Sequence, residues 1–219
     1  MDRVLEPEIM DGEVEADAYA RADFSDSNQW YVEHLVREFA SHLANVVDLG
    51  CGPADVPVRL ARAMPAAQIT AVDGSAAMLR LAREAIRAAG VHDRIRVHQG
   101  RLPDPALTEH SFDAVLSKDM LHHLPDPQVL WNEARRLVRP GGAVYVMDLV
   151  RPDSPLEARE IVERISHDED PVLKEDFYNS LCAAFTLEEV RAQLRVAGLP
   201  LHVEQISDRH MRVKGRIGA

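Results

Sequence analysis

Residues 45–53 read NVVDLGCGP, a short apolar run that ends in a turn with two glycines. Apolar side chains then follow three or four positions apart as far as Met64, which is the spacing of an amphipathic helix. The order is therefore strand, tight turn and helix. Because glycine has no Cβ, Gly50 and Gly52 let the backbone turn sharply and let a ligand approach the amides that open the helix. Two glycines alone also fit a plain connecting turn.

The same cycle of strand, turn and helix repeats along the chain. Strands that alternate with helices form a mostly parallel sheet, joined by right-handed crossovers and covered by helices on both faces. The later segments of this pattern are a strand at 68–72, a helix at 77–89, strands at 94–98 and 112–116, a helix at 128–138, a turn at 140–142 and a strand at 143–149.

The last part of the chain follows a different pattern. A helix is expected over 155–166, followed by a polar segment at 167–176, and another helix is expected over 186–197. Strands expected at 201–206 and 211–217 are separated by only four residues, so they would form an antiparallel hairpin. A mostly parallel sheet would thus end on an antiparallel pair.

Composition and charge restrict the kind of partner. The chain has 219 residues, which suits one domain, and 25 basic against 36 acidic side chains give a formal charge of -11. This charge repels a phosphate backbone, so nucleic acid is not expected as a partner. Residues 1–11 lack the features of a secretory leader and no apolar run of about 18 residues occurs, so a cytoplasmic protein without a membrane span is expected. Cys51 and Cys182 have no ligand-pair spacing, and no metal site is expected.

An acidic residue ends the second predicted strand. Asp73 follows Gly52 by 21 residues, a position from which a carboxylate accepts hydrogen bonds from both hydroxyls of a ribose. A dinucleotide site would have a third glycine at position 55, where this chain has Asp55, so a bound phosphate is disfavoured. An adenosine without phosphate is the consistent ligand. Met78, one turn into the next helix, suits either the adenine or the core.

Five motifs stand in order along the chain: VVDLGCGP at 46–53, AVDGS at 71–75, SFDAV at 111–115, LHHL at 121–124 and LVRPGG at 137–142. With them, the region of roughly residues 45–150 resembles the class I S-adenosylmethionine-dependent methyltransferases, especially the ubiquinone/menaquinone methyltransferase-like group. The resemblance implies an α/β fold: a Rossmann-like, doubly wound, mostly parallel seven-stranded sheet with a C-terminal antiparallel hairpin and helices on both faces.

The resemblance also implies a site for the methyl donor. Asp48, Gly50 and Gly52 would contact its methionine portion, Asp73 would hold the ribose, and Met78 would lie by the adenine. The full set of residues expected to bind S-adenosyl-L-methionine is Asp48, Gly50, Cys51, Gly52, Asp73, Gly74, Ser75, Met78, Gly100, Arg101, Leu102, Ser117 and Lys118.

At two places in this set, the residues differ from those of similar enzymes or need a particular orientation. Similar enzymes often have Gly-Asp after the third strand, where this chain has Gly100-Arg101, so the backbone or Leu102 would contact the adenine edge instead. Ser117 and Lys118 match the position that lines the donor near its sulfonium. Because an ammonium beside a sulfonium is unfavourable, the Lys118 side chain is expected to point outward.

Methyl transfer is an in-line displacement that depends mainly on positioning. Orientation alone is worth effective molarities of about 10⁵ to 10⁸ M. A general base is needed only if the acceptor holds its proton. The candidate catalytic residues are Tyr19, His122 and His123, and the further histidines are His210 and His167, which stands beside Asp168. Each of these residues also suits a structural or solvated role.

Two helices are expected before the first strand, over 15–22 and 27–43. In similar enzymes such a leader covers the donor, so Tyr19 and Phe24 are expected either in a lid or packed in the core. The expected organisation is a helical lid or cap segment at 1–44 and a donor-binding methyltransferase domain at 45–219.

The function expected from these features is methyl transfer from S-adenosylmethionine to a small-molecule acceptor. The alternatives are a tRNA or protein methyltransferase and a protein that binds the donor without transferring its methyl group. The acidic charge opposes tRNA, and no amide-methylating motif follows the fourth strand, where Ser117-Lys118-Asp119-Met120 stands. The acceptor atom, whether oxygen, nitrogen, carbon or sulfur, and the formation of a homodimer do not follow from these residues.

Overall fold

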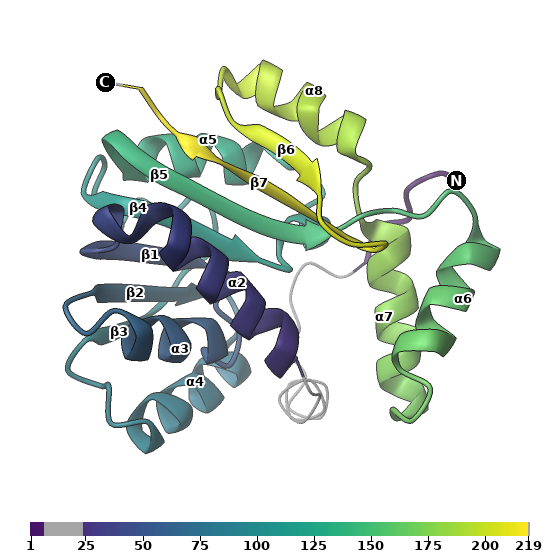
Figure 1. Ribbon diagram of the computed structural model, residues 1–219, viewed down its shortest axis with the longest axis horizontal. Coiled ribbons are helices and arrows are strands. Elements are labelled where there is room, and N and C mark those ends of the chain that lie inside the picture. Colours follow the sequence, from purple (N-terminus) through teal and green to yellow (C-terminus); the bar gives the residue numbers. More distant parts are fainter. Residues whose placement is uncertain (7–23, 219) are drawn as a thin grey trace.

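A seven-stranded sheet with the order β3-β2-β1-β4-β5-β7-β6 forms the centre of the computed structural model, which describes residues 1–6 and 24–218 (Figure 1). The first five strands run parallel, and β7 pairs antiparallel with both β5 and β6. This confirms the Rossmann-like sheet with a final antiparallel hairpin. The strands are β1 (Asn45–Leu49), β2 (Gln68–Asp73), β3 (Ile95–Gln99), β4 (Phe112–Lys118), β5 (Val138–Leu149), β6 (His202–Gln205) and β7 (His210–Arg216).

Helices cover both faces of the sheet, as expected (Figure 1). One apolar core joins the sheet to α2, α3 and α4, and a second joins its other face to α5 and α8. Val46 belongs to the first core and Val47 to the second, because neighbouring side chains of a strand point to opposite faces. The helices are α2 (Ser25–Phe39), α3 (Asp55–Ala63), α4 (Ala76–Ala88), α5 (Gln128–Leu137), α6 (Pro155–Ile165), α7 (Pro171–Ala183) and α8 (Leu187–Ala197), with short 3-10 helices η1 (Ala40–His42) and η2 (Leu121–His123).

Two of the expected elements differ in the structure, and a third cannot be compared. The helix expected at 27–43 is α2 followed by η1, and the helix expected at 15–22 lies outside the described residues. The turn expected at 140–142 is part of β5, which begins at Val138 and pairs with β4 through a register irregularity. Val138 pairs with Phe112 and Ala143 pairs with Ala114, so residues 139–142 form an irregularity inside β5 and not a turn between elements.

The helix α7 was not expected, because its first half carries polar side chains. Asp170 caps it by accepting the N–H of Val172, and its buried residues are confined to the last turn. It packs with α6 around a small apolar cluster of its own, beside the end of the sheet (Figure 1). Tertiary contact with α6, more than its own periodicity, therefore stabilises α7.

The first six residues lie against α7 and η2. The N–H of Val4 donates to the carbonyl of Cys182 at 3.0 Å, and the Arg3 guanidinium donates to the carbonyls of His122 and Leu124 at 2.7 and 3.0 Å. This segment therefore reaches the loop that follows β4. Within residues 1–6 and 24–218, no helix combines the length and the apolar character that crossing a bilayer requires.

Candidate functional site

A cavity of about 570 Å³ opens at the carboxyl ends of β1, β2 and β4. The order of the strands reverses between β1 and β4, and open parallel sheets bind ligands at such a switch point. The walls are the turns after β1 and β2, the segments after β3 and β4, and the start of α2. Of the residues expected to bind the donor, those that line the cavity are Asp48, Gly50, Cys51, Gly52, Asp73, Gly74, Ser75, Met78, Gly100, Arg101, Leu102 and Lys118.

The turn after β1 requires glycine for both conformation and space. Gly50 has a φ of +75°, in the left-handed region that favours glycine. A Cβ at this position would come within 2.7 Å of the Met120 side chain. The amides of Gly50 and Cys51 both donate to the carbonyl of Val72 at 2.9 Å, which joins this turn to the end of β2. The two turns thus form one wall of the cavity.

Asp73 is held in place by backbone amides on both sides. One of its carboxylate oxygens accepts the N–H of Gly52 and the other accepts the N–H of Ser75, each at 2.8 Å. The cap of α4 is Ser75, whose hydroxyl accepts the N–H of Met78 at 3.2 Å. Asp73 is therefore not the capping residue of α4, and its carboxylate has a fixed position in the cavity wall.

Asp48 places a second carboxylate in this wall. Its side chain is buried, and among the described residues its Oδ1 atom has no hydrogen-bond partner. Burial raises the pKa of Asp48 to about 7, and the charge of Asp73 acts in the same direction, against the charge of Lys118. A cation in the cavity would satisfy this oxygen and favour its ionised form.

The two residues expected near the sulfonium have different positions. Lys118 lines the cavity, but its side chain is buried and its ammonium pairs with Asp119, so it does not point outward as expected. The hydroxyl of Ser117 donates to the carbonyl of Leu49 at 2.9 Å, and its side chain is fully buried within the sheet, away from the cavity lining. Ser117 therefore supports the end of β1, just before the turn at Gly50 and Gly52.

The segment after β3 has Arg101 after Gly100, and the nearby carboxylate belongs to Asp104. Asp104 lies where a side chain at Gly100 would be, because an added Cβ would come within 1.8 Å of the Asp104 carboxylate. That carboxylate pairs with His98 at 2.7 Å. Arg101 and Leu102 remain in the cavity wall, so an apolar side chain and the backbone are available to a ligand there.

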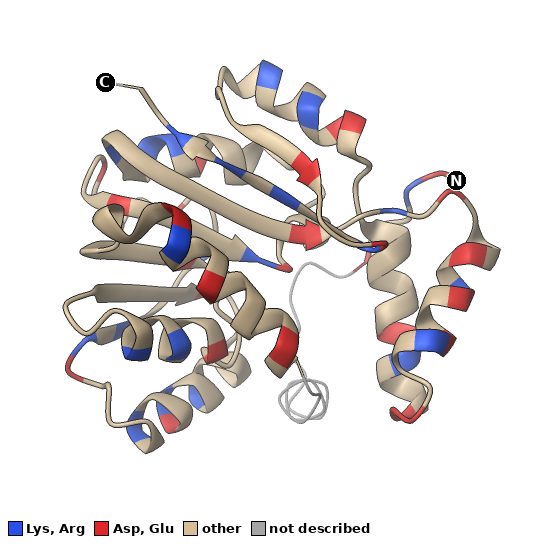
Figure 2. Ribbon diagram, viewed as in Figure 1, with Lys and Arg blue, Asp and Glu red and all other residues tan. Residues whose placement is uncertain are grey.

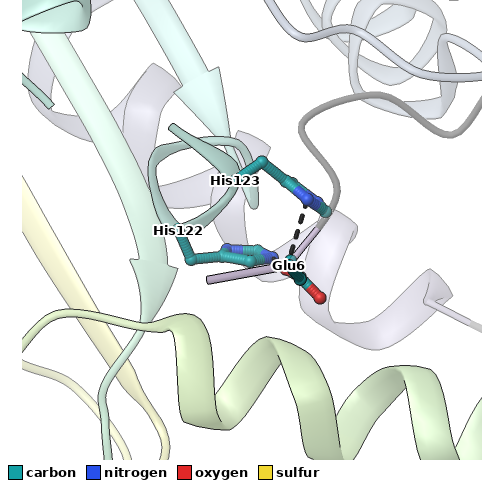
Figure 3. Close-up of side chains that lie close together, drawn as sticks. All are labelled: Glu6, His122 and His123. Atoms are coloured by element: carbon teal, nitrogen blue, oxygen red, sulfur yellow. Dashed lines mark ion pairs between the residues drawn. The ribbon is translucent and has the colours of Figure 1, made fainter. Parts of the chain in front are cut away.

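A histidine pair lies at the end of the cavity beyond β4. His122 is buried and its Nδ1 lies 2.6 Å from Asp148, whereas His123 lines the cavity. Burial alone would lower the pKa of His122, but the charge and hydrogen bond of Asp148, together with the charge of Glu6, raise that pKa to about 9. Glu6 Oε1 lies 3.3 Å from His122 Nε2 and 3.2 Å from His123 Nδ1 (Figure 3).

Sequence reasoning did not identify Glu6 or Asp148. Asp148 stands at the end of β5, and its position at the carboxyl edge of a parallel strand was the available signal. Glu6 had none, because only folding brings the first six residues to η2.

The remaining sequence candidates have separate positions. Phe24 lies at the cavity edge with 36% of its surface exposed, and Tyr19 lies outside the described residues. His167 is exposed next to Asp168. Burial lowers the pKa of His210 to about 4, and its ring contacts the hydroxyl of Ser207 at 3.1 Å. Neither histidine lines the cavity.

Comparison with known proteins agrees with this geometry. Residues 46–142 match the family described as methyltransferase domain. This stretch of the chain is similar to a methyltransferase domain. It contains the turn at Gly50 and Gly52, β2, and the histidines His122 and His123 that follow β4. The family implies S-adenosyl-L-methionine as the cofactor, and the carboxylates of Asp48 and Asp73 suit a cationic molecule that carries a ribose.

Two relatives are similar to the chain in sequence, and one solved structure is similar to it in fold. The chain is 28% identical to 27-O-demethylrifamycin SV methyltransferase of Amycolatopsis mediterranei over 74% of this chain and 56% of the relative. It is 29% identical to demethylmenaquinone methyltransferase of Lactiplantibacillus plantarum over 58% of this chain and 54% of the relative. The chain thus spans little more than half the length of these relatives. A methyltransferase from Aquifex aeolicus has the same fold, with a TM-score of 0.71 at 18% identity over 94% of this chain and 98% of that one.

Proposed function

We propose that this chain is an S-adenosylmethionine-dependent methyltransferase that acts on a small-molecule acceptor. The observation that carries the proposal is the position of Asp73, whose carboxylate is fixed in the cavity wall by the amides of Gly52 and Ser75. Each oxygen of a carboxylate accepts more than one hydrogen bond, so the same group is suited to the two hydroxyls of a ribose.

The proposed contact between Asp73 and the ribose also places the other parts of the donor. The methionine portion would pass along the backbone of the turn at Gly50 and Gly52, with its ammonium toward the buried carboxylate of Asp48. The adenine would lie between Met78 and Leu102, which line the cavity on the β2 and β3 side. The donor residues proposed from the sequence keep these roles, except that Ser117 acts by supporting Leu49.

Charge in the cavity suits a cationic donor. The ammonium of Lys118 is paired with Asp119, so this pair has no net charge to repel a sulfonium. Asp48 and Asp73 add negative charge to the same wall. When bound, the donor supplies an electrophilic methyl group, which moves to the acceptor as the sulfonium becomes a neutral thioether. The chain contributes by fixing the geometry and by excluding water from the cavity.

A small-molecule acceptor is favoured over nucleic acid. Both named relatives are described by small-molecule substrates, a rifamycin and a menaquinone precursor. The basic side chains along β7 do not form a phosphate-binding stripe, because Arg212 and Lys214 pair with Glu38 at 2.8 and 2.6 Å (Figure 2). We assign the acceptor to the end of the cavity near His123, with Tyr19, His122 and His123 as the proposed catalytic residues and residues 1–44 as the proposed cap.

Calorimetry tests the donor half of this proposal. The full chain should bind S-adenosylmethionine and its demethylated product, S-adenosylhomocysteine, with one site each. The absence of heat for both ligands would contradict the proposal. Radiolabelled donor then tests transfer against a panel of phenols, quinols and hydroxylated macrocycles. Donor binding without transfer to any panel member would favour a binding protein instead.

A further inference from the structure

Three potential metal ligands meet at the far end of the cavity. Glu6 comes from the first residues of the chain, and His122 and His123 come from η2 (Figure 3). One ligand atom from each residue lies within 4.8 Å of the other two. The sequence suggested no metal site, because these residues are brought together only by folding.

The distances around Glu6 suit a shared ion. Its Oε1 atom lies 3.3 Å from His122 Nε2 and 3.2 Å from His123 Nδ1. Zinc binds nitrogen and carboxylate oxygen at about 2.0–2.2 Å, so neighbouring ligand atoms of a tetrahedral site lie about 3.4 Å apart. Both contacts agree with that spacing. The two imidazole rings, with centroids 4.2 Å apart, would need only to turn their nitrogens toward a common centre.

The Glu6 carboxylate is buried and incompletely satisfied. Its side chain is 10% exposed, and its Oε1 atom makes no contact of hydrogen-bond geometry within the described part of the chain. The other oxygen accepts the hydroxyl of Ser180 at 3.2 Å, which holds the carboxylate in place. Oε1 is close to both rings but accepts no hydrogen bond from the described residues, and a cation between Glu6 and the two rings would coordinate it.

A second carboxylate, that of Asp148, fixes the orientation of the His122 ring from the side opposite Glu6. Asp148 Oδ1 lies 2.6 Å from His122 Nδ1, and Asp148 Oδ2 accepts the N–H of Leu121 at 2.7 Å. This bond keeps a proton on Nδ1, so that Nε2, the atom facing Glu6, becomes the electron-pair donor when a metal ion displaces its proton. Metal-binding histidines almost always donate their other ring N–H to a carboxylate, a backbone carbonyl or a water, and Asp148 fills this role for His122.

Charge at this end of the cavity also favours a divalent ion. Glu6 and Asp148 bring two negative charges to the cluster. Arg3 is a nearby positive group that offsets part of this charge, and its guanidinium donates to the carbonyls of His122, Leu124 and Ala183 and lies over the ring of Phe185. The remaining negative charge would attract a cation.

We propose that Glu6, His122 and His123 form a binding site for a divalent transition-metal ion of the zinc type. Two nitrogens and one carboxylate oxygen are the ligands that such ions prefer, and three protein ligands leave a fourth position open. His123 lines the cavity, so that position is accessible to a molecule bound there. The site does not depend on the proposed methyl transfer, because it rests on the three ligands and Asp148 alone.

Metal titration of the full chain without the donor tests this site. After removal of metal with a chelator and of any affinity tag, calorimetry with Zn²⁺ should show one site with a dissociation constant of about 1 μM or below. Co²⁺ should bind with the visible absorption of a low-coordinate ion. The absence of a stoichiometric site for either ion would overturn the proposal and leave the cluster as an ion pair between Glu6 and a protonated His122.

Variants locate the site if an ion binds. Glu6→Gln and His123→Asn should each lower the affinity at least tenfold, and Asp148→Asn should lower it about 10- to 100-fold through His122. The matched control is His202→Asn, an exposed histidine on β6 that should leave the affinity unchanged. Retention of full affinity in both Glu6→Gln and His123→Asn would place the ion elsewhere. If a variant fails to fold, as seen by circular dichroism, the Co²⁺ spectrum of the unaltered chain decides the question.

Discussion

The Asp73 carboxylate accepts the backbone N–H of Gly52 at 2.8 Å. This bond connects the end of β2 to the turn after β1, so one side chain sets the spacing between two walls of the cavity. Its other oxygen holds the amide of Ser75, the residue that opens α4. The same carboxylate therefore organises the cavity wall and is proposed to bind the ribose.

Replacing this carboxylate should weaken donor binding. Asp73→Asn removes the charge, and each charged hydrogen bond lost costs about 1.5 to 3 kcal/mol, or roughly 10- to 150-fold in affinity. Calorimetry with S-adenosylhomocysteine measures the change. Glu160→Gln, an exposed acid on α6, serves as the control and should bind as the unaltered chain does. Unchanged affinity in Asp73→Asn would show that the ribose lies elsewhere.

Donor affinity should rise with pH through the titration of Asp48. The pKa of this buried carboxyl is raised to about 7, so it is largely neutral at pH 5.5 and largely ionised at pH 8. Only the ionised form attracts the positive donor. The dissociation constant measured across this range should fall several-fold with rising pH, and Asp48→Asn should flatten the profile. A pH dependence that survives this substitution would assign the titration to another group.

The buried carboxyl group of Asp48 should also make folding less favourable at high pH. Because the folded pKa of Asp48 is raised, the folded state holds more protons than the unfolded state between pH about 4 and 7, and its stability falls as pH rises through that window. Asp48→Asn removes this cost. Urea denaturation should therefore find the variant more stable at pH 8, by about 1 kcal/mol or more, with a smaller difference at pH 4. Equal stability of both proteins at pH 8 would contradict the burial effect.

Gly50 is expected to tolerate no side chain. Gly50→Ala places a Cβ within 2.7 Å of Met120 and requires a left-handed backbone at an alanine, so stability should fall by about 2 to 4 kcal/mol. Gly90→Ala is the matched control, because Gly90 has a similar φ of +68° with no atom within 4 Å of the added Cβ. It should cost only about 1 kcal/mol. Thermal or urea unfolding measures both, and equal losses would show that the contact with Met120 is relieved at no cost.

A buried hydroxyl joins α2 to the sheet. Tyr31 Oη donates to the carbonyl of Tyr145 in β5 at 2.9 Å, and burial raises the pKa of Tyr31 so that it remains a donor. Tyr31→Phe should lower the free energy of unfolding by about 1 kcal/mol, as measured with urea. Tyr178→Phe, a partly exposed tyrosine on α7, should change it by less than about 0.5 kcal/mol. A larger effect at Tyr178 than at Tyr31 would contradict this account.

The sheet and the position of the turns after β1 and β2 were predictable because their signals are local. A strand, a glycine turn and a helix occupy neighbouring residues, and the repeat of this unit implies parallel strands whose carboxyl ends share one edge. Gly50, Gly52 and Asp73 therefore lie together, as expected. Lys118 was wrongly expected to point outward, because the sequence reveals neither its pairing with Asp119 nor the left-handed backbone of Asp119, whose φ is 54°.

The sequence by itself determined the mostly parallel sheet and the residues at the ends of β1 and β2, because hydrophobic periodicity and turn residues act over short stretches. Only the tertiary structure decided what surrounds the histidines. Glu6 reaches them from the first residues and Asp148 from the end of β5. Contacts between segments so far apart in the chain arise from packing of α7, η2 and the sheet, and no local pattern records them.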